Sequence, residues 1–317
     1  MWLLQRRRPA VSVVVVVYNM AREAPRTLQS LSAAYQRDID PREYEIIVVD
    51  NGSQPPFDRQ FIDGLAGNFR LVRIDPASPS PVSAVNRGIA EARGDVIGVM
   101  IDGARLVTPG LLHLAHQAAC LYDRAVVVTL GWYLGPDFQR SAMLTGYDQA
   151  REDALLASID WPADGYRLFE IATLDESSVA GWFQPIAESN ALFLRRELWR
   201  ELGGMDERFA SPGGGLVNLD TYSRAIELPH ARQVLLLGEG TFHQVHGGVA
   251  TNATSEQMQE RWTGWAAEYE NIRGRPYAKS SMASTTYLGT IPGTMLIHFA
   301  KAAVSIVQRS SELPPRT

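Results

Sequence analysis

Polar side chains follow three apolar runs of the sequence directly, and their types are suited to binding a ligand. They are Tyr18 and Asn19 after "VSVVVVV", Asp50 and Asn51 after "EIIVV", and Asp102 after "VIGVMI". A single acid in such a place usually caps the next turn. Three run ends of the same character favour a shared ligand site, because the carboxyl ends of neighbouring parallel strands lie at one edge of a sheet.

The order of elements predicts such a sheet. Runs dense in β-branched residues and without alternation are typical of strands that are covered on both faces. These runs occupy residues 11–17, 45–50, 69–74 and 95–102. Helical patterns separate them, for example Val82, Val85 and Ile89 at three- and four-residue spacing. The alternation of strand and helix predicts an α/β fold with a doubly wound sheet and right-handed crossovers.

Residues 131–187 interrupt this regularity. The segment is rich in aromatic and acidic residues and has no clean period, and a long stretch of this kind is usually functional or mobile. Trp132, Trp161 and Trp182 could face a sugar ring, although burial is the more common fate of tryptophan. We interpret the segment as an insertion that serves either as a lid over a second substrate, an acceptor if the bound ligand is a group donor, or as a surface for a partner.

The composition bears on whether the protein binds nucleic acid, which compartment it occupies and whether it crosses a membrane. The 317 residues carry a formal net charge of -5, which gives no general attraction to nucleic acid. Cys120 is the only cysteine, so the chain has no internal disulfide, as expected of a cytoplasmic protein. Residues 287–307 are apolar, but Pro292, His298 and Lys301 make a membrane span costly. The pattern favours a helix that docks on its own domain, with peripheral membrane contact as the alternative.

Five blocks of the sequence, taken in order, resemble the family 2 glycosyltransferases, which have the GT-A fold. The blocks are "VSVVVVVYN", "YEIIVVDNGS", "AVNRGIAEARGDVIGVMIDGARLVTPGLL", "NALFLRRELWRELGGMDERF" and "GGGLVNLDTYSRA". The resemblance implies a GT-A-like doubly wound mixed sheet flanked by helices over residues 9–250, with residues 131–187 as an insertion. Residues 251–317 are expected to form a C-terminal helical extension that packs on this domain.

The resemblance also implies a reaction and a donor site. The family transfers a sugar from a nucleoside diphosphate donor such as a UDP-sugar to an acceptor hydroxyl, with inversion. Tyr18, Asn19 and Asp50, with the adjacent Asn51, match the residues that hold the nucleobase. A carboxylate can accept hydrogen bonds from a base N–H, and an aromatic ring offers a stacking surface. A further block of the family matches residues 85–88 and implies that Asn86 and Arg87 lie near the donor phosphates and sugar, although a surface ion pair is the plainer reading of this arginine.

The family's D-x-D motif, which positions the ribose and a divalent metal, is altered here. It reads Asp102-Gly103-Ala104, and one carboxylate is a poor cage for Mg²⁺ or Mn²⁺. Two remedies are open. His243 or His246, in a loop where related enzymes bring a histidine to the metal, could join Asp102, and imidazole suits Mn²⁺ better than Mg²⁺. Alternatively, Arg105 could supply the positive charge directly.

The position of the general base is altered as well. The family provides a carboxylate after two glycines to take the proton of the acceptor hydroxyl, but Val217 and Asn218 stand at these positions. Asp220 is the nearest acid and the first choice, although it could instead cap the following helix. Glu188 and Asp206 are the reserves.

Two functions therefore remain for the chain. The first is an active glycosyltransferase in glycan or polysaccharide biosynthesis, and the second is a nucleotide-sugar-binding or scaffold module that has lost turnover. A dinucleotide-dependent oxidoreductase is excluded because no G-x-G-x-x-G follows the first strand, where "YNMAREAP" stands. A nucleotidyltransferase is disfavoured because the sequence has no glycine- and lysine-rich loop there.

Overall fold

The computed structural model describes residues 8–179, 181–183, 186, 190–246, 255–280 and 285–311. Its strands are β1 (Val11–Val17), β2 (Tyr44–Asp50), β3 (Phe69–Arg73), β4 (Val96–Met100), β5 (Arg105–Val107), β6 (Ala125–Leu134), β7 (Ala172–Leu174), β8 (Leu192–Arg195), β9 (Arg232–His243) and β10 (Thr285–Gly289). Its α-helices are α1 (Glu23–Ser30), α2 (Arg59–Asp63), α3 (Val82–Glu91), α4 (Leu111–Leu121), α5 (Gln139–Leu144), α6 (Gln149–Ala157), α7 (Arg196–Leu202), α8 (Val217–Ile226), α9 (Ser255–Arg273) and α10 (Leu296–Ser311). Short 3₁₀ turns are η1 (Gly165–Ile171), η2 (Gly181–Phe183), η3 (Pro212–Gly214) and η4 (Gly293–Met295).

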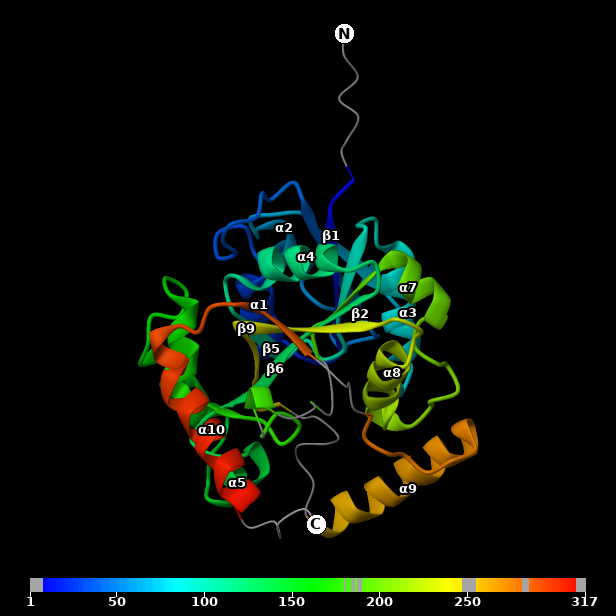
Figure 1. Ribbon diagram of the computed structural model, residues 1–317. Coiled ribbons are helices and arrows are strands. Elements are labelled where there is room, and N and C mark those ends of the chain that lie inside the picture. The colour runs from blue at the N-terminus through cyan, green and yellow to red at the C-terminus, as the bar shows by residue number, and fades with distance from the viewer. Residues whose placement is uncertain are drawn as a thin grey trace.

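Within the described residues the strands form one mixed sheet, in the order β10-β9-β6-β8-β4-β1-β2-β3 (Figure 1). Strands β1, β2, β3 and β4 are parallel, whereas β8 runs antiparallel to both of its neighbours, β4 and β6. Two short strands lie off this path, with β5 paired to β9 and β7 paired to β6. The predicted doubly wound α/β architecture with a mixed sheet is confirmed.

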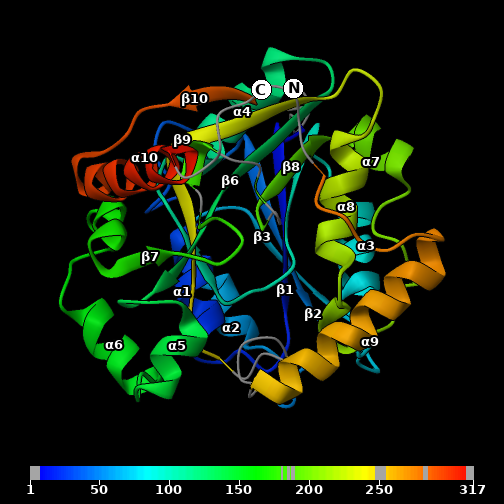
Figure 2. The same cartoon turned by 60° about the horizontal axis from the view of Figure 1, so that its bottom comes forward.

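Helices cover both faces of the sheet, as the unbroken apolar strands require. Val13 and Val15 of β1 pack on one face with apolar residues of α1 and α4, and Val14 and Val16 pack on the other with residues of α3, α7 and α8. Figure 2 shows α3, α7, α8 and α9 along one side of the sheet. Helix α3 lies so close to β1 that a Cβ atom on Gly88 would stand 2.3 Å from a methyl group of Val14.

The segment without a clean period contributes secondary structure to the domain. Strand β6 continues to Leu134, so it includes the first residues of the segment, and β7, α5 and α6 follow. The three tryptophans predicted either to face a sugar or to be buried are all buried, with exposed fractions of 0% for Trp132, 7% for Trp161 and 2% for Trp182. Trp132 packs edge-on against Phe169. These indoles are therefore part of the same hydrophobic core as Val14 and Val16 of β1.

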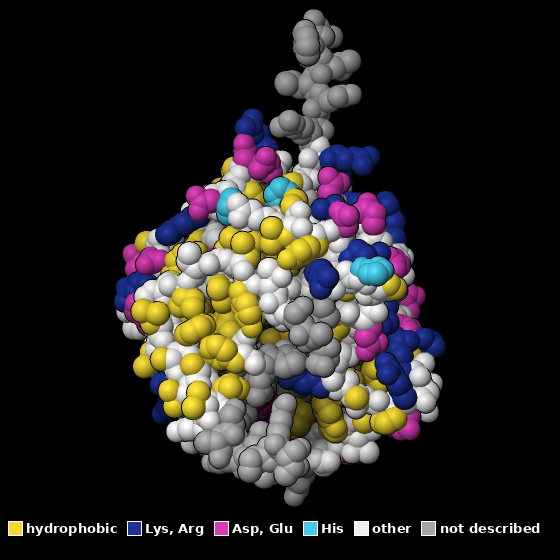
Figure 3. All heavy atoms as spheres, viewed as in Figure 1, with side chains coloured by type: hydrophobic (Ala, Val, Ile, Leu, Met, Phe, Trp, Pro, Cys, Tyr) yellow, Lys and Arg dark blue, Asp and Glu magenta, His cyan; other side chains and the backbone are white. Residues whose placement is uncertain are grey.

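The C-terminal extension contains a strand in addition to helices. Strand β10 pairs in parallel with β9 and forms one edge of the sheet. The sequence had predicted only helices for this part of the chain. Helix α10 packs on the domain through Phe299, whose ring lies 5.0 Å from that of Trp182, and through the buried Ala302. Four large apolar side chains of α10 are exposed, Leu296, Ile297, Val304 and Val307. Figure 3 shows a hydrophobic area at the left of the molecule, where Figure 1 shows this helix. No helix within the described ranges combines the length and apolar character needed to cross a bilayer.

Glu239 of β9 gives the fold a pH dependence that can be measured. The side chain is 3% exposed and accepts a hydrogen bond from the Tyr166 hydroxyl at 2.9 Å. Burial raises the pKa of Glu239 from its ordinary 4.5 to about 7. Because the folded protein holds the proton more tightly than the unfolded chain, this group's contribution to stability falls as pH rises from 4.5 to 7 and stays low above it.

We expect Glu239→Gln, which resembles the protonated acid, to be about 3 kcal/mol more stable than the wild type at pH 8 and equally stable near pH 4.5. Urea unfolding followed by circular dichroism at both pH values measures the difference. An equal difference at the two pH values would contradict the assignment of the effect to this carboxyl group.

Candidate active site

The strand register brings the predicted ligand residues to one edge of the sheet. Val17 of β1 lies opposite Asp50 of β2, and Val15 lies opposite Met100 of β4. Tyr18, Asp50 and Asp102 thus follow three neighbouring strands. The loop that carries Asp102 packs on β1, since a Cβ atom on Gly103 would stand 2.7 Å from the Val16 carbonyl oxygen.

Asp50 folds the segment that follows β2. Its carboxylate is 1% exposed and accepts hydrogen bonds from the N–H of Ser53 at 2.8 Å and of Phe57 at 3.1 Å. Arg73 pairs with it at 2.6 Å. Burial opposes ionisation, but the hydrogen bonds from Ser53, Phe57 and Arg73 together lower the pKa of Asp50 below its ordinary value. The sequence prediction did not include this set of partners, and a nucleobase contact by Asp50 stays a prediction.

The neighbouring amides join loops to one another. Asn19, at φ 54°, accepts a hydrogen bond from the N–H of Gln54 at 2.8 Å. The Asn51 amide nitrogen donates to the Ser78 carbonyl at 2.9 Å. Tyr18 differs from both, because its side chain is 50% exposed. Its ring therefore offers an open surface at the sheet edge, of the kind on which a planar base can stack.

Asn86 and Arg87 make contacts with the protein itself. The Asn86 amide exchanges two hydrogen bonds of 2.9 Å with the backbone of Met205, which ties α3 to the loop after α7. Arg87 forms an ion pair with Glu91 at 2.8 Å on the outer side of α3, the surface ion pair that was its plainer reading. Contact of either residue with donor phosphates stays a prediction.

Asp102, His243 and His246 come together as a cluster. The carboxylate Oδ2 of Asp102 lies 2.8 Å from Nε2 of His243 and 3.4 Å from Nε2 of His246. One ligand atom from each residue lies within 4.8 Å of the others. The fold produces this cluster through β5, which starts three residues after Asp102 and pairs antiparallel with β9, placing Arg105 opposite His243.

The charge states of the cluster follow from burial and proximity. Burial lowers the pKa of His243 to about 4, so its ring is neutral at pH 7. Burial also disfavours charge on His246, yet the adjacent Asp102 carboxylate raises its pKa above the ordinary value. Burial of Asp102 is outweighed by the two histidines, which hold the pKa of this carboxyl well below its usual range.

The donor atoms of the cluster fit a divalent cation. Gln139 Oε1, an acceptor, lies 2.6 Å from Nδ1 of His243, which favours the tautomer with its proton on Nδ1 and its Nε2 lone pair toward Asp102 and His246. The Nε2 atoms of the two histidines lie 3.1 Å apart, so the N–H of His246 can be shared between His243 and Asp102. A cation held by all three residues would take the place of this proton. Two imidazoles and one carboxylate suit Mn²⁺ better than Mg²⁺.

Arg105 lies beside this cluster but is turned into the protein. It is 6% exposed, and its Nη1 is 3.4 Å from the Thr241 hydroxyl and 3.8 Å from the Asp175 carboxylate. These contacts point the guanidinium of Arg105 toward buried partners. They do not favour the alternative in which Arg105 supplies the positive charge in place of a metal ion.

Asp220 joins α8 to α9. It is 1% exposed, and it pairs with Arg224 at 2.8 Å and with Arg273 at 2.5 Å. Arg273 also pairs with Asp206 at 2.9 Å. Asp220 is the fourth residue of α8, so it is not the N-cap that its position in the sequence suggested. Glu188 lies outside the described residues.

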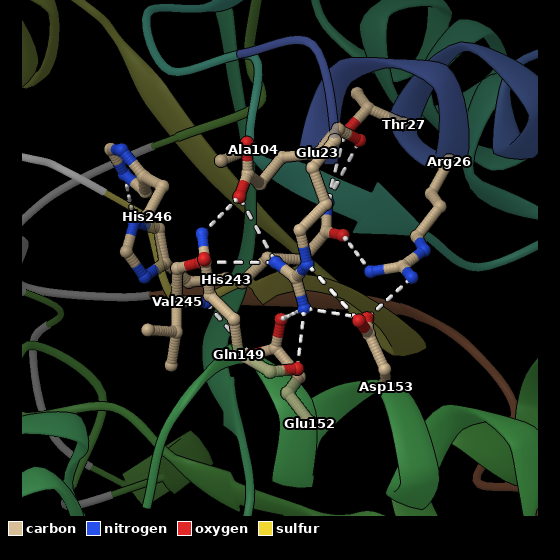
Figure 4. Close-up of polar contacts among 12 residues, drawn as sticks. Glu23, Arg26, Thr27, Ala104, Gln149, Glu152, Asp153, His243, Val245 and His246 are labelled. Atoms are coloured by element: carbon tan, nitrogen blue, oxygen red, sulfur yellow. Dashed lines mark hydrogen bonds and ion pairs between the residues drawn. The ribbon is translucent and has the colours of Figure 1, made fainter.

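Two side chains that the sequence did not single out support the histidines. Glu152 of α6 accepts a hydrogen bond from the N–H of Val245 at 2.8 Å, and Arg22 donates to the carbonyl of the same residue at 3.1 Å. Figure 4 shows how this polar network surrounds the loop that carries His243 and His246. Both partners are far from the loop in sequence, and no motif marked them.

Solved structures of S. aureus TarS are similar to the chain. The structure of TarS 1-349 matches with a TM-score of 0.46 and 16% identity, over 82% of this chain and 65% of that chain. The same fragment in complex with UDP gives a TM-score of 0.46 at 16% identity, 82% coverage of this chain and 65% of that chain. The complex with UDP-GlcNAc gives 0.49 at 16% identity, 82% and 66%. The chain thus spans slightly less than two thirds of the length of the TarS fragments that it matches.

The family comparison covers the strands that Tyr18, Asp50 and Asp102 follow. No curated protein matches the sequence, whereas a model described as glycosyl transferase family 2 matches residues 12–160. This segment includes the ends of β1, β2 and β4, and therefore Tyr18, Asp50 and Asp102. The family resemblance is therefore confirmed over residues 12–160.

Proposed function

We propose that the protein is a metal-dependent glycosyltransferase that moves a sugar from a nucleoside diphosphate donor, such as a UDP-sugar, to an acceptor hydroxyl. The observation that carries the proposal is the cluster of Asp102, His243 and His246 at the edge of the family 2 segment. It compensates for the second acid missing from the D-x-D motif. The acceptor is proposed to be a glycan in polysaccharide biosynthesis.

The residues at the sheet edge have distinct proposed roles. Tyr18 would stack on the base, with Asp50 nearby as the acceptor for a base N–H. Asp102, His243 and His246 would hold a divalent cation, preferably Mn²⁺, which when bound neutralises charge on the diphosphate.

The proposed transfer inverts the anomeric carbon. The acceptor oxygen forms a bond to the anomeric carbon while the bond between this carbon and the diphosphate oxygen breaks. The nucleoside diphosphate leaves with the electrons of the broken bond. The proton of the hydroxyl passes to a carboxylate base. Asp220 and Glu188 remain the proposed candidates, and Asp220 could serve only with an oxygen released by Arg224 or Arg273.

Nucleotide binding tests the proposal. Isothermal titration calorimetry of the full chain with UDP, GDP and dTDP is expected to detect binding of at least one nucleotide, and Mn²⁺ is expected to tighten it more than Mg²⁺ because two of the three ligands are imidazoles. Failure of all three nucleotides to bind, with or without Mn²⁺, would contradict the proposal.

The second candidate function is a nucleotide-sugar-binding module without turnover. It is favoured by the two arginine partners of Asp220 and by Asn218 at the usual position of the base. This module would bind nucleotide but would not release UDP, GDP or dTDP from the corresponding nucleotide sugars. Measurement of released nucleoside diphosphate, with simple sugars supplied as acceptors, separates the two functions.

A further inference from the structure

The two histidines of the cluster are separated by two residues whose backbone is held on several sides. The N–H of Val245 is bound by Glu152, and its carbonyl accepts from Arg22 at 3.1 Å and from Gln149 at 3.3 Å. The N–H of Gln244 donates to the Ala104 carbonyl at 2.8 Å. The loop therefore has little freedom to move the two rings apart.

The ring of His243 has its own support from a different helix. Gln139, the first residue of α5, is 2% exposed, and its Oε1 lies 2.6 Å from Nδ1 of His243. Within the described residues its Nε2 has no hydrogen-bond partner. A buried amide with an unpaired nitrogen costs stability, so the contact with His243 is a poor device for stability alone.

The orientation of the proton on this ring decides what Nε2 can do. With the proton on Nδ1, Nε2 presents a lone pair toward Asp102 and His246, as a metal ligand must. With the proton on Nε2, the ring would donate to Asp102 across the observed 2.8 Å, and that hydrogen bond would have to break before a cation could bind. The acceptor at Nδ1 favours the first arrangement, and His246, whose Nε2 lies 3.1 Å from that of His243, can then supply the N–H shared with Asp102.

We propose that Gln139 is a positioning residue that fixes the tautomer of His243 and thereby presents Nε2 to the cation. This inference rests on the proposed function for the cation itself. It also assigns a task to residues 131–187, because Gln139 and Glu152 both come from this insertion. Residues 131–187 would then hold His243 and the loop after it in place through Gln139 and Glu152, in addition to any contact with an acceptor.

Substitutions at position 139 separate positioning from packing. Gln139→Leu removes the acceptor, and we expect it to weaken Mn²⁺ binding about 10- to 100-fold with little change in the melting temperature. Gln139→Glu keeps an acceptor at Nδ1 and is expected to retain the affinity of the wild type. Gln117→Leu, at an exposed position of α4, is the matched control. Calorimetric titration of each full-length protein with MnCl₂ gives the affinities.

A second readout does not depend on metal binding. Nitrogen-15 NMR of histidine-labelled, metal-free protein reports which ring nitrogen carries the proton. We expect Nδ1–H for His243 in the wild type and in Gln139→Glu, and Nε2–H in Gln139→Leu. Wild-type affinity for Mn²⁺ in Gln139→Leu, or an unchanged tautomer, would overturn the positioning role and leave the cation site standing. Absence of Mn²⁺ binding in the wild type would overturn the proposed cation site, and the role of Gln139 with it.

Discussion

Replacing Asp102 by asparagine is expected to reduce sugar transfer by a factor on the order of 1,000. Asp102 is the one carboxylate of the cluster with His243 and His246, and a hard divalent cation depends on negatively charged oxygen. The asparagine variant keeps the size of the side chain and removes its charge. The rate of transfer at saturating donor and Mn²⁺, together with calorimetric titration of Mn²⁺, measures the effect.

A matched control for this variant is Asp123→Asn. The Asp123 side chain is 100% exposed and lies 4.0 Å from Arg195, so its charge is solvated and far less consequential for the fold. We expect this control to transfer sugar at the wild-type rate. If Asp102→Asn also kept the wild-type rate, and a chelator had no effect on either protein, the cluster would not be the cation site.

The second large effect is expected on stability. Asp220→Ala should lower the free energy of unfolding by about 3 kcal/mol, because Arg224 and Arg273 would lose a buried partner. Urea unfolding followed by circular dichroism measures the loss. Asp63→Ala removes an exposed carboxylate that lies 3.6 Å from Arg59 and is expected to cost less than about 1 kcal/mol. An unchanged unfolding midpoint in Asp220→Ala would show that the buried ion pairs are not needed for the fold.

Asp220→Asn distinguishes a structural role from a role as the base. Asparagine can still accept hydrogen bonds from an arginine but cannot take up a proton at neutral pH. Loss of transfer with a small change in stability would identify Asp220 as the base. If activity and stability fell together, Asp220 would be a structural tie, and Glu188 would become the first candidate.

The strands and their shared edge could be predicted because their signals are local. Tyr18, Asp50 and Asp102 each follow their own apolar run directly. Parallel strands then bring the ends of these runs together by topology. The pairing of Asp102 with the two histidines needed more than local signals. The family resemblance offered His243 or His246 as one of two alternatives, beside Arg105, and the pairing of β5 with β9 is what brings both histidines to Asp102.

The partners of individual side chains could not be predicted, since they depend on the tertiary register. Asn86 matched a motif near donor phosphates, but its partner is the backbone of Met205 on another loop. Gln139 lies in a segment without periodicity, and only the folded chain brings it to His243. Strand β10 was missed for a similar reason, because residues 285–289 become a strand by adding to the edge of β9.

The pairing of β5 with β9 also has a consequence for the order in which the protein acquires its chemistry. Asp102 leaves the ribosome early, whereas His243, the last residue of β9, and His246, which follows this strand, are made much later. Domains acquire structure progressively from the N-terminus during synthesis. A nascent chain that stops before β9 would already contain β1, β2 and β4 but neither histidine, so the proposed cation site could form only after β9 has been made.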